Sequence, residues 1–586
     1  MTQEDIDSML VNELKLELSK LGAPTSGKKA ELVERLKNLR TEPKMISIEA
    51  DLVGEEESRY ANLFNKMKTP VYGPLNLGAI IAIGLSLLMI SSVLILKPSW
   101  LGFGDDYEYE LIDFDISQAK TYAEELVALG HPEWEGRMSG TIEETNTAEY
   151  ISQKFTEMGY AAEINEFQVP MHHVNSEPSF RLCVRGIGVS PCDGPVGQIG
   201  GSQITPFIHR SDYVIQGFSG QSNYQFNDDV PVTDLGNGTD ESLWQSATGT
   251  IGYLRAENSQ MSNTLIYTNA VKNDLAGIIS ANKYHNCGQI EGNDCVPIFK
   301  GTNYDALVEA NGGSVPTDIP FIAISKDTGD IFETMVINSS EPASIELLID
   351  VTNDEQRTIY VPCGVKQGRT SEVIIAGGHH DTVYHGQGAV DDTSGTVTVM
   401  EMARQMSLIY EQSGIPERTV KFCTWGGEEE GLWGSRAYVE EMQSSLRENL
   451  RLYLNFDMNH VDSDFENRGN HLTLFTNDED DYGHIKRIAE LYKTERSEIA
   501  QKYDIRFSLL DGDQGESDEM PCNSDHCPFV YDLGGKKGRA VSCYGSGSLE
   551  YHTYLDTMDR FHEESLAVSG TIYGTYMRLL AYDLNV

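Results

Sequence analysis

Short apolar runs alternate with helix-like patterns in the second half of the chain. Val373–Ala376, Val420–Trp425 and Arg451–Phe456 are rich in β-branched and aromatic residues and have the length of strands. Thr396–Met406, between the first two runs, has the apolar spacing of a helix, and an earlier amphipathic helix is expected to end at Gly159. Strand–helix–strand order predicts an α/β domain whose mixed, largely parallel sheet carries helices on both faces.

The longest apolar run, residues 77–96, contains 20 residues without a charge. A helix of that length spans about 30 Å, the thickness of the hydrocarbon layer. Because 76 residues precede it, the run predicts a transmembrane signal anchor and not a cleaved signal peptide. Basic residues lie shortly before the span and acidic residues follow Lys97. The positive-inside rule therefore predicts a single-pass cell membrane protein with a cytoplasmic N-terminus and an extracellular C-terminal part.

Charge and length divide the chain further. The chain has 586 residues, of which 90 are acidic and 44 are basic, so its net charge is −46. The residues after Lys97 carry −45 of this charge. This balance excludes a protein that coats nucleic acid along its whole length, and a hydrophobic content of 40% excludes wholesale disorder. The expected parts are a helical module (1–40), a linker (41–76), the span (77–96), a second linker (97–112), the α/β domain (113–199 and 346–586) and a β-rich insert (200–345).

All nine cysteines follow the predicted span, which agrees with an oxidising compartment for this part. Three pairs are close enough in sequence for local disulfides, although spacing alone does not fix the pairing: Cys183 with Cys192, Cys287 with Cys295, and Cys522 with Cys527.

The N-terminal module has two leucine-rich helical stripes separated by Gly22-Ala23-Pro24. Lys28 and Lys29 fall in the first turn of the second helix, where free backbone N–H groups favour anions. The segment resembles the SAP motif, which usually binds DNA, and this resemblance implies that Gly27, Lys28 and Lys29 approach phosphates. A helical hairpin that docks a protein, or a plain cytoplasmic cap, is the alternative.

Polar clusters follow each of the three predicted strands. The sequences are GGHHDTVYHGQGAVDD, TWGGEEEGLWGS and NFDMNH, with a further cluster, YHTYLDT, near the C-terminus. Parallel strands bring their carboxyl ends to one edge of a sheet, so these clusters are expected to meet. Imidazole and carboxylate groups together are typical of a divalent metal centre, and histidine favours zinc over magnesium.

Residues 113–586 resemble the di-zinc exopeptidases of the bacterial aminopeptidase, glutamate carboxypeptidase II and transferrin receptor kind. The resemblance implies the zinc exopeptidase fold and two Zn²⁺ per chain. It assigns His379 and Asp457 to one ion, Glu429 and His552 to the other, and Asp391 as the bridge. It further implies Glu428 as general base toward a metal-activated water, Asp381 as a carboxylate behind the ligands, and Tyr551 as a residue that stabilises the oxyanion.

The same pattern fixes the register of the three consecutive glutamates. The family pattern is Glu-Glu-x-Gly-Leu-x-Gly-Ser, and Gly431-Leu432-Trp433-Gly434-Ser435 matches its last five positions. Glu430 is then the first variable position and is expected to face solvent. The family resemblance also makes His380 and His385 bystanders, although both are tempting as ligands.

The insert resembles a protease-associated domain, and an unrelated β insertion is the alternative. Residues 523–529 resemble the Ser-Asp-His-x-x-Phe segment of the aminopeptidase branch, and only 34 residues follow His552, too few for the C-terminal helical domain of the carboxypeptidase branch. The sequence therefore predicts a membrane-anchored zinc aminopeptidase that acts on peptides, with DNA as a further candidate partner. A carboxypeptidase of the glutamate carboxypeptidase type and a catalytically silent, receptor-like binding protein remain the alternatives.

Overall fold

The computed structural model describes residues 107–185, 192, 202–255, 261–281, 296–339, 343–462, 469–546 and 550–586, and a few positions before them. The chain divides into two units, Met1–Tyr107 and Glu108–Val586. In the first unit, β1 (Pro70–Tyr72) pairs with β2 (Leu75–Asn76). The predicted span 77–96 lies outside the described residues, and within the described ranges no helix has the length and hydropathy to cross a membrane.

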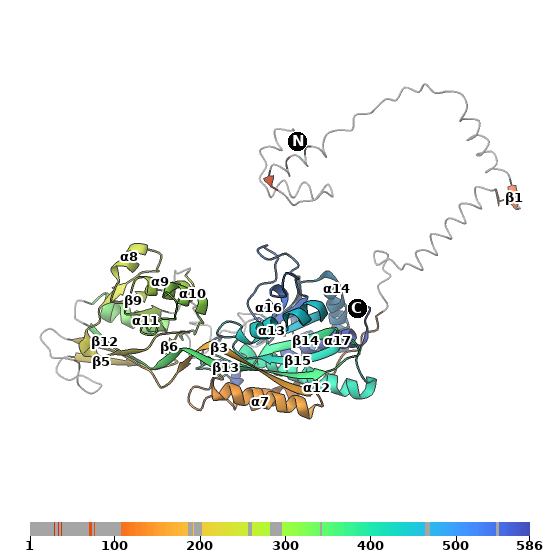
Figure 1. Cartoon of the computed structure of the whole chain (residues 1–586), viewed down its shortest axis with the longest axis horizontal. Coiled ribbons are helices and arrows are strands. Elements are labelled where there is room, and N and C mark those ends of the chain that lie inside the picture. The colour runs from red at the N-terminus through yellow and green to blue at the C-terminus, as the bar shows by residue number, and fades with distance from the viewer. Residues whose placement is uncertain are drawn as a thin grey trace, which may run out of the picture. The chain divides into compact units, whose positions relative to one another are not determined.

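The second unit is built on an eight-stranded mixed sheet (Figure 1). Its strand order is β18 (Asp504–Leu509), β17 (His471–Thr476), β19 (Ala540–Tyr544), β16 (Leu450–Phe456), β14 (Val373–His379), β15 (Thr419–Trp425), β13 (Val351–Lys366) and β3 (Ala161–Val174). The central strands β19, β16, β14 and β15 run parallel to one another, whereas β13 is antiparallel to both of its neighbours, β15 and β3. The predicted mixed sheet and its three sequence-derived strands, β14, β15 and β16, are confirmed.

Alternate residues of the central strands enter two different cores. On β14, Ile374 and Ala376 join one cluster while Val373 and Ile375 join another, as the two-residue period of a strand requires. Both sides are covered by helices, so both sets of side chains are apolar. The first core receives α6 (Ile116–Val127), α7 (Ile142–Glu157), α12 (Ser394–Ser413), α14 (Glu479–Glu495) and α17 (Leu566–Tyr582), and the second receives α13 (Trp433–Asn449) and α16 (His526–Tyr531).

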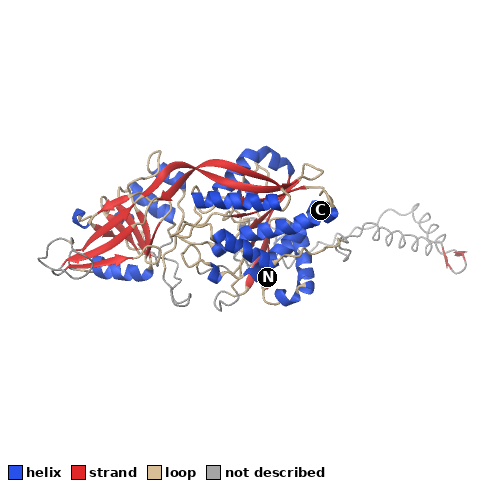
Figure 2. Cartoon of the chain, turned by 90° about the horizontal axis from the view of Figure 1, so that it is seen from below, coloured by secondary structure: helices blue, strands red, loops and turns tan. Residues whose placement is uncertain are grey.

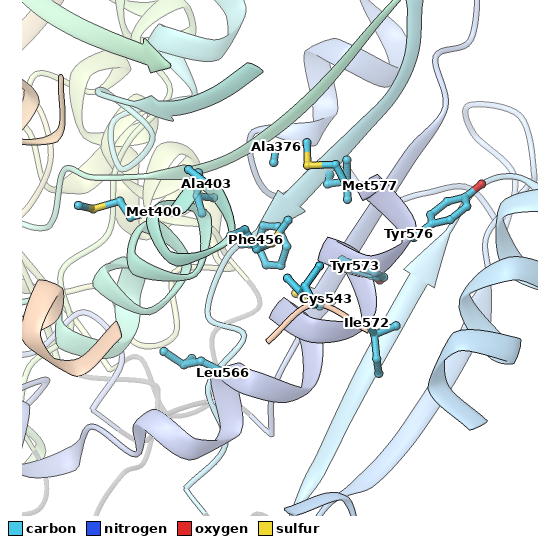
Figure 3. Packing of buried hydrophobic residues seen from close by; sticks show 14 of the residues in the cluster. Ala376, Met400, Ala403, Phe456, Cys543, Leu566, Ile572, Tyr573, Tyr576 and Met577 are labelled. Carbon is cyan, nitrogen blue, oxygen red and sulfur yellow. The ribbon is translucent and has the colours of Figure 1, made fainter. Parts of the chain in front are cut away.

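Figure 3 shows the first core at close range. Ala403 of α12 and Tyr573 of α17 lie beside Phe456, the last residue of β16. All three side chains are fully buried. The packing fixes the end of β16, from which the chain continues directly to Asp457.

A second lobe is inserted between β3 and β13. It contains an antiparallel sheet of β5 (Ser202–Phe207), β4 (Ser179–Arg185), β12 (Ala343–Ile349) and β7 (Ser222–Tyr224). Its other sheet contains β6 (Tyr213–Ile215), β11 (Phe321–Ile324), β10 (Gly277–Ala281), β9 (Ile251–Leu254) and β8 (Val232–Asp234), with helices α8 (Glu241–Ser246), α9 (Asn263–Lys272), α10 (Tyr304–Ala310) and α11 (Lys326–Phe332). The sequence placed the start of the insert at residue 200. Because β4, which precedes that residue, pairs with β12 of the insert, the insert begins earlier than predicted. The paired strands β3 and β13 run between the two lobes (Figures 1 and 2).

Disulfides join Cys183 to Cys192 and Cys522 to Cys527, which confirms two of the predicted pairs. The third predicted pair, Cys287 with Cys295, lies outside the described residues. A further bond, between Cys363 of β13 and Cys423 of β15, was not predicted, since 60 residues separate its two halves. The strand register places these two residues directly opposite each other.

Loss of the Cys363–Cys423 bond is expected to destabilise the protein more than loss of the Cys522–Cys527 bond. Chain entropy alone assigns about 4 kcal/mol to a 60-residue loop and about 2 kcal/mol to a 5-residue loop. Chemical denaturation of the double Cys→Ala variant of each pair measures the difference. A larger loss of stability in the Cys522/Cys527 variant would contradict this expectation.

Candidate metal centre

The predicted ligands come from the ends of three neighbouring strands. His379 is the last residue of β14, Asp457 directly follows β16, and Glu428 and Glu429 follow β15 after a two-glycine turn. These strands are adjacent and parallel, so their carboxyl ends meet at one edge of the sheet. Asp391 lies at the entrance to α12, where the Asp391–Asp392 peptide bond is cis.

The five residues assigned as ligands form two groups that share Asp391. One contains His379, Asp391 and Asp457, the other Asp391, Glu429 and His552, and in each group one donor atom per residue lies within 4.8 Å of the others. Asp391 Oδ1 is 3.2 Å from His379 Nε2, and Asp391 Oδ2 is 3.1 Å from His552 Nε2. Each oxygen of this carboxylate thus faces a different group, as a bridging ligand requires.

Backbone carbonyls orient both imidazoles. His379 Nδ1 donates to the carbonyl oxygen of Asp381 at 3.1 Å, and His552 Nδ1 donates to that of Phe299 at 3.0 Å. A carbonyl oxygen can only accept, so both rings carry the proton on Nδ1. The Nε2 of each ring faces the carboxylates, so it is the nitrogen that would bind a metal.

The cluster concentrates negative charge in a buried place. Burial, together with the neighbouring carboxylates, raises the pKa of Asp457 to about 6 and raises the pKa of Glu429. Glu429 Oε1 is buried and accepts no hydrogen bond from the residues that the structure describes. Mutual repulsion and an unsatisfied carboxylate oxygen are the features that a bound cation would relieve. The donor set therefore fits divalent metal ions.

Glu428 lies beside the two groups without belonging to either. Its carboxylate Oε2 is 3.9 Å from His379 Nε2, and burial, with the charges of Asp457 and Asp525, raises its pKa well above the ordinary value. Asp381 accepts hydrogen bonds from the backbone N–H groups of Glu428 and Glu429, each at 3.3 Å. Although burial favours its neutral form, the hydrogen bond and charge of His379 hold the pKa of Asp381 below its ordinary value. Asp381 thus links the end of β14 to the turn that carries Glu428 and Glu429.

Tyr551 stacks on the imidazole of His552, with ring centroids 3.7 Å apart. Burial and the carboxylates of Asp391, Glu429 and Glu428 raise its pKa well above the ordinary value. The phenol is therefore protonated at neutral pH and can donate a hydrogen bond into the site.

Three buried residues that support the site were not identified from the sequence. Asp392 accepts from His379 N at 3.2 Å and from Met458 N at 2.9 Å, so it joins the ends of β14 and β16. Asp556 accepts from Asp391 N at 3.0 Å, and the guanidinium of Arg137 donates to three groups of the β14–α12 loop. Asp392 and Asp556 stood within the quoted motifs, and their full burial is the property that sequence does not reveal.

Two histidines lie outside the donor groups, and one glutamate is not where it was expected. His380 pairs with buried Glu144 at 3.1 Å, and His385 is buried without a hydrogen-bond partner among the described residues. Neither belongs to the two groups. The expectation that Glu430 faces solvent was wrong, since it is only 4% exposed. Backbone hydrogen bonds from Gly431 and Leu432 to Glu428 close a tight turn, which holds Glu430 against the domain.

The metal groups line a cleft of about 680 Å³ to which both lobes contribute. The large domain supplies the ligands and apolar residues such as Phe475, Leu510 and Met520, while the insert supplies residues 300–305. The sequence did not single out this segment or Phe299, the residue just before it, which contacts His552. In the N-terminal unit, Lys28 and Lys29 are exposed and Lys29 is helical, whereas Gly27 lies outside the described residues.

Comparison with known proteins gives two family matches. Residues 363–577 match the model of peptidase family M28, and residues 5–41 match that of the SAP domain. The first of these segments contains all five residues of the two metal groups.

Individual relatives are similar over part of their length. An aminopeptidase of Pseudomonas aeruginosa is 28% identical over 218 residues, 37% of this chain and 36% of the relative. A probable lipoprotein aminopeptidase of Mycobacterium tuberculosis is 26% identical over 290 residues, 47% of this chain and 54% of the relative. The chain thus spans about a third to a half of these curated relatives. The solved structure of a zinc aminopeptidase from Bacillus subtilis shares the fold, with a TM-score of 0.55 at 18% identity over 80% of this chain and 96% of that one.

Proposed function

From the premise that this chain carries a peptidase family M28 domain at residues 363–577, we propose that it is a zinc-dependent exopeptidase that removes N-terminal residues from peptides. The observation that carries the proposal is the pair of donor groups joined by Asp391 next to Glu428. A receptor-like protein without catalysis has no need of this complete set. The aminopeptidases among its relatives support the choice of the amino end over the carboxyl end.

Two zinc ions fit the donor groups. His379, Asp391 and Asp457 would hold one, and Asp391, Glu429 and His552 the other. When bound, zinc supplies Lewis acidity that polarises a carbonyl group and lowers the pKa of water.

The residues around the donors supply proton transfer and positioning. The Glu428 carboxylate accepts the proton of the attacking water and delivers it to the leaving amine nitrogen. Asp381 fixes the backbone of Glu428 and Glu429 through its two accepted hydrogen bonds. The protonated hydroxyl of Tyr551 donates a hydrogen bond to the carbonyl oxygen as negative charge develops on it. Phe299 and Asp381 hold the two imidazoles through their carbonyl groups.

Hydrolysis of aminoacyl amides by the purified protein, beside N-blocked peptides, tests the proposal. We expect turnover of free-amine substrates, loss of activity with a chelator and its return with zinc. Cleavage of N-blocked peptides alone, from their carboxyl end, would replace the aminopeptidase by a carboxypeptidase. Lack of bound zinc would contradict the metallopeptidase altogether.

The remaining parts of the chain suggest where the enzyme works. We propose that residues 77–96 anchor it in the cell membrane with the peptidase domain outside, on the strength of the apolar run and the flanking charges. We also propose that the SAP domain binds DNA on the cytoplasmic side, through the exposed Lys28 and Lys29. Retention of peptidase activity after deletion of residues 1–40 would separate this binding from catalysis.

A further inference from the structure

A fully buried glutamate contacts the residue that follows His379. Glu144 lies in the first turn of α7, outside the residues that match the peptidase family. Its carboxylate Oε1 accepts a hydrogen bond from Tyr360 N at 3.0 Å and forms another with His380 Nε2 at 3.1 Å. The other oxygen, Oε2, has no hydrogen-bond partner among the described residues. Because burial of a carboxylate costs free energy, this position is unfavourable unless its contacts serve the protein in another way.

Capping of α7 does not account for this carboxylate. Thr141 and Glu144 have the spacing of a capping box, in which the glutamate side chain would accept from the backbone N–H of the N-cap residue. Thr141 N instead donates to the carbonyl oxygen of Met138 at 3.3 Å, while Thr141 Oγ1 accepts from Glu144 N at 3.4 Å. The helix thus begins with one half of the box, and the Glu144 side chain is free to contact other elements.

His380, the partner of Glu144, is the middle residue of three on which the metal groups depend. His379 before it belongs to the first donor group. Asp381 after it accepts hydrogen bonds from the backbone N–H groups of Glu428 and Glu429. A displacement of His380 would therefore move a ligand on one side and the turn with the two glutamates on the other.

The main chain of His380 is held on both sides, and Glu144 fixes its side chain. His380 N donates to the carbonyl oxygen of Trp425 at 2.9 Å, and its own carbonyl oxygen accepts from Arg137 Nε at 3.2 Å. The imidazole is fully buried and its Nδ1 has no hydrogen-bond partner in the described part of the chain. The hydrogen bond from Nε2 to Glu144 is thus the polar contact that orients this ring.

Glu144 also packs against the start of the turn that carries Glu428. A Cβ atom at Gly426 would lie 2.7 Å from Glu144 Oε1, closer than a side chain can approach, so glycine is required there. Ser139, which precedes α7, accepts from Gly427 N at 2.5 Å. One short segment of the chain therefore contacts both the end of β14 and the turn after β15.

We propose that Glu144 is a positioning residue for the proposed peptidase. Through its hydrogen bond with His380, it fixes the place of His379 relative to Glu428 and Glu429. The inference rests on the proposed function and adds to it a residue that belongs to neither donor group and does not line the cleft. Glu144 acts only through the residues that it holds.

Substitution of Glu144 separates positioning from substrate binding. Glu144→Ala is expected to lower kcat about 10- to 100-fold at saturating zinc and to weaken zinc binding about 10- to 100-fold. KM should stay within about threefold of the wild-type value, because no contact with the substrate is removed. Steady-state kinetics and zinc content at a series of free zinc concentrations measure these effects.

A conservative variant and a control accompany this experiment. Glu144→Gln keeps an oxygen that can accept from Tyr360 N and from His380 Nε2, so it should restore kcat and zinc affinity to within about threefold of the wild type. Glu149→Ala removes an exposed glutamate of the same helix and should leave both quantities unchanged.

The pathway through His380 is tested by a double variant. Effects of residues that act through each other are not additive. The kcat of Glu144→Ala/His380→Ala is therefore expected to lie within about threefold of that of the weaker single variant. A loss equal to the product of the two single losses would mean that Glu144 acts independently of His380, which would overturn the inference.

Thermal denaturation of the same samples distinguishes positioning from stability. A lower melting temperature of Glu144→Ala with wild-type kcat and zinc affinity would reduce Glu144 to a structural residue and overturn the inference, as would equal losses in the Gln and Ala variants. If Glu144→Ala does not fold, Glu144→Asp, which withdraws the carboxylate by one methylene, takes its place with the same expected direction. These results leave the wild-type peptidase active, whereas lack of turnover by the wild type would overturn the proposed function and this inference with it.

Discussion

Replacement of Glu428 by Gln is expected to lower kcat on the order of 10³-fold while bound zinc stays unchanged. The amide cannot take the proton of the attacking water, yet Glu428 belongs to neither donor group, so both groups remain complete. Its backbone N–H would still donate to Asp381, because the substitution does not alter the main chain. Steady-state kinetics and metal analysis of the same sample measure both effects.

Glu430→Gln is the matched control for this experiment. Glu430 is two residues away in the same turn, it is buried, and neither of its carboxylate oxygens accepts a hydrogen bond among the described residues. Burial raises its pKa well above the ordinary value, so its neutral acid already resembles an amide. Its variant should lose less than about fivefold in kcat, since no proton transfer is removed. Equal losses in both variants would show that the register of the glutamates was assigned wrongly.

Replacement of Asp391 by Ala is expected to remove more metal than replacement of any other ligand. Asp391 alone belongs to both donor groups, with one oxygen toward each histidine. Loss of a supporting residue commonly weakens metal binding about 10- to 100-fold, and loss of a shared ligand should exceed that range at both positions. Zinc content after dialysis against a series of free zinc concentrations measures the two affinities.

Asp457→Ala and His552→Ala provide the comparison for Asp391. Each removes a ligand from one group and leaves the three residues of the other in place. Each variant should therefore retain about one ion under conditions in which Asp391→Ala retains none. Retention of two ions by Asp391→Ala would contradict a bridging role.

Sequence was sufficient for the parts of the site that depend on local order. β14, β15 and β16 were recognisable because strands buried on both faces are nearly continuous apolar runs. His379 and Asp457 could then be placed at one sheet edge, since the carboxyl ends of parallel strands meet there. The two ligand groups follow from that geometry and the family resemblance.

Contacts between distant parts of the chain were beyond such reasoning. Cys363 and Cys423 pair because β13 runs beside β15, which spacing along the chain does not reveal. Glu430 was expected to face solvent because the family pattern makes it the variable position, yet the turn folds it inward. Phe299 carries no chemical signature at all, because it acts through its main-chain carbonyl group.

The hydrogen bonds between Phe299 and His552 also bear on the order of folding. The two residues are 253 positions apart, and the first lies in the insert while the second belongs to a donor group of the large domain. A contact of this kind closes a long loop of chain, which costs more conformational entropy than a local contact does. The second donor group is therefore expected to close late in folding, after the insert and the large domain have each formed.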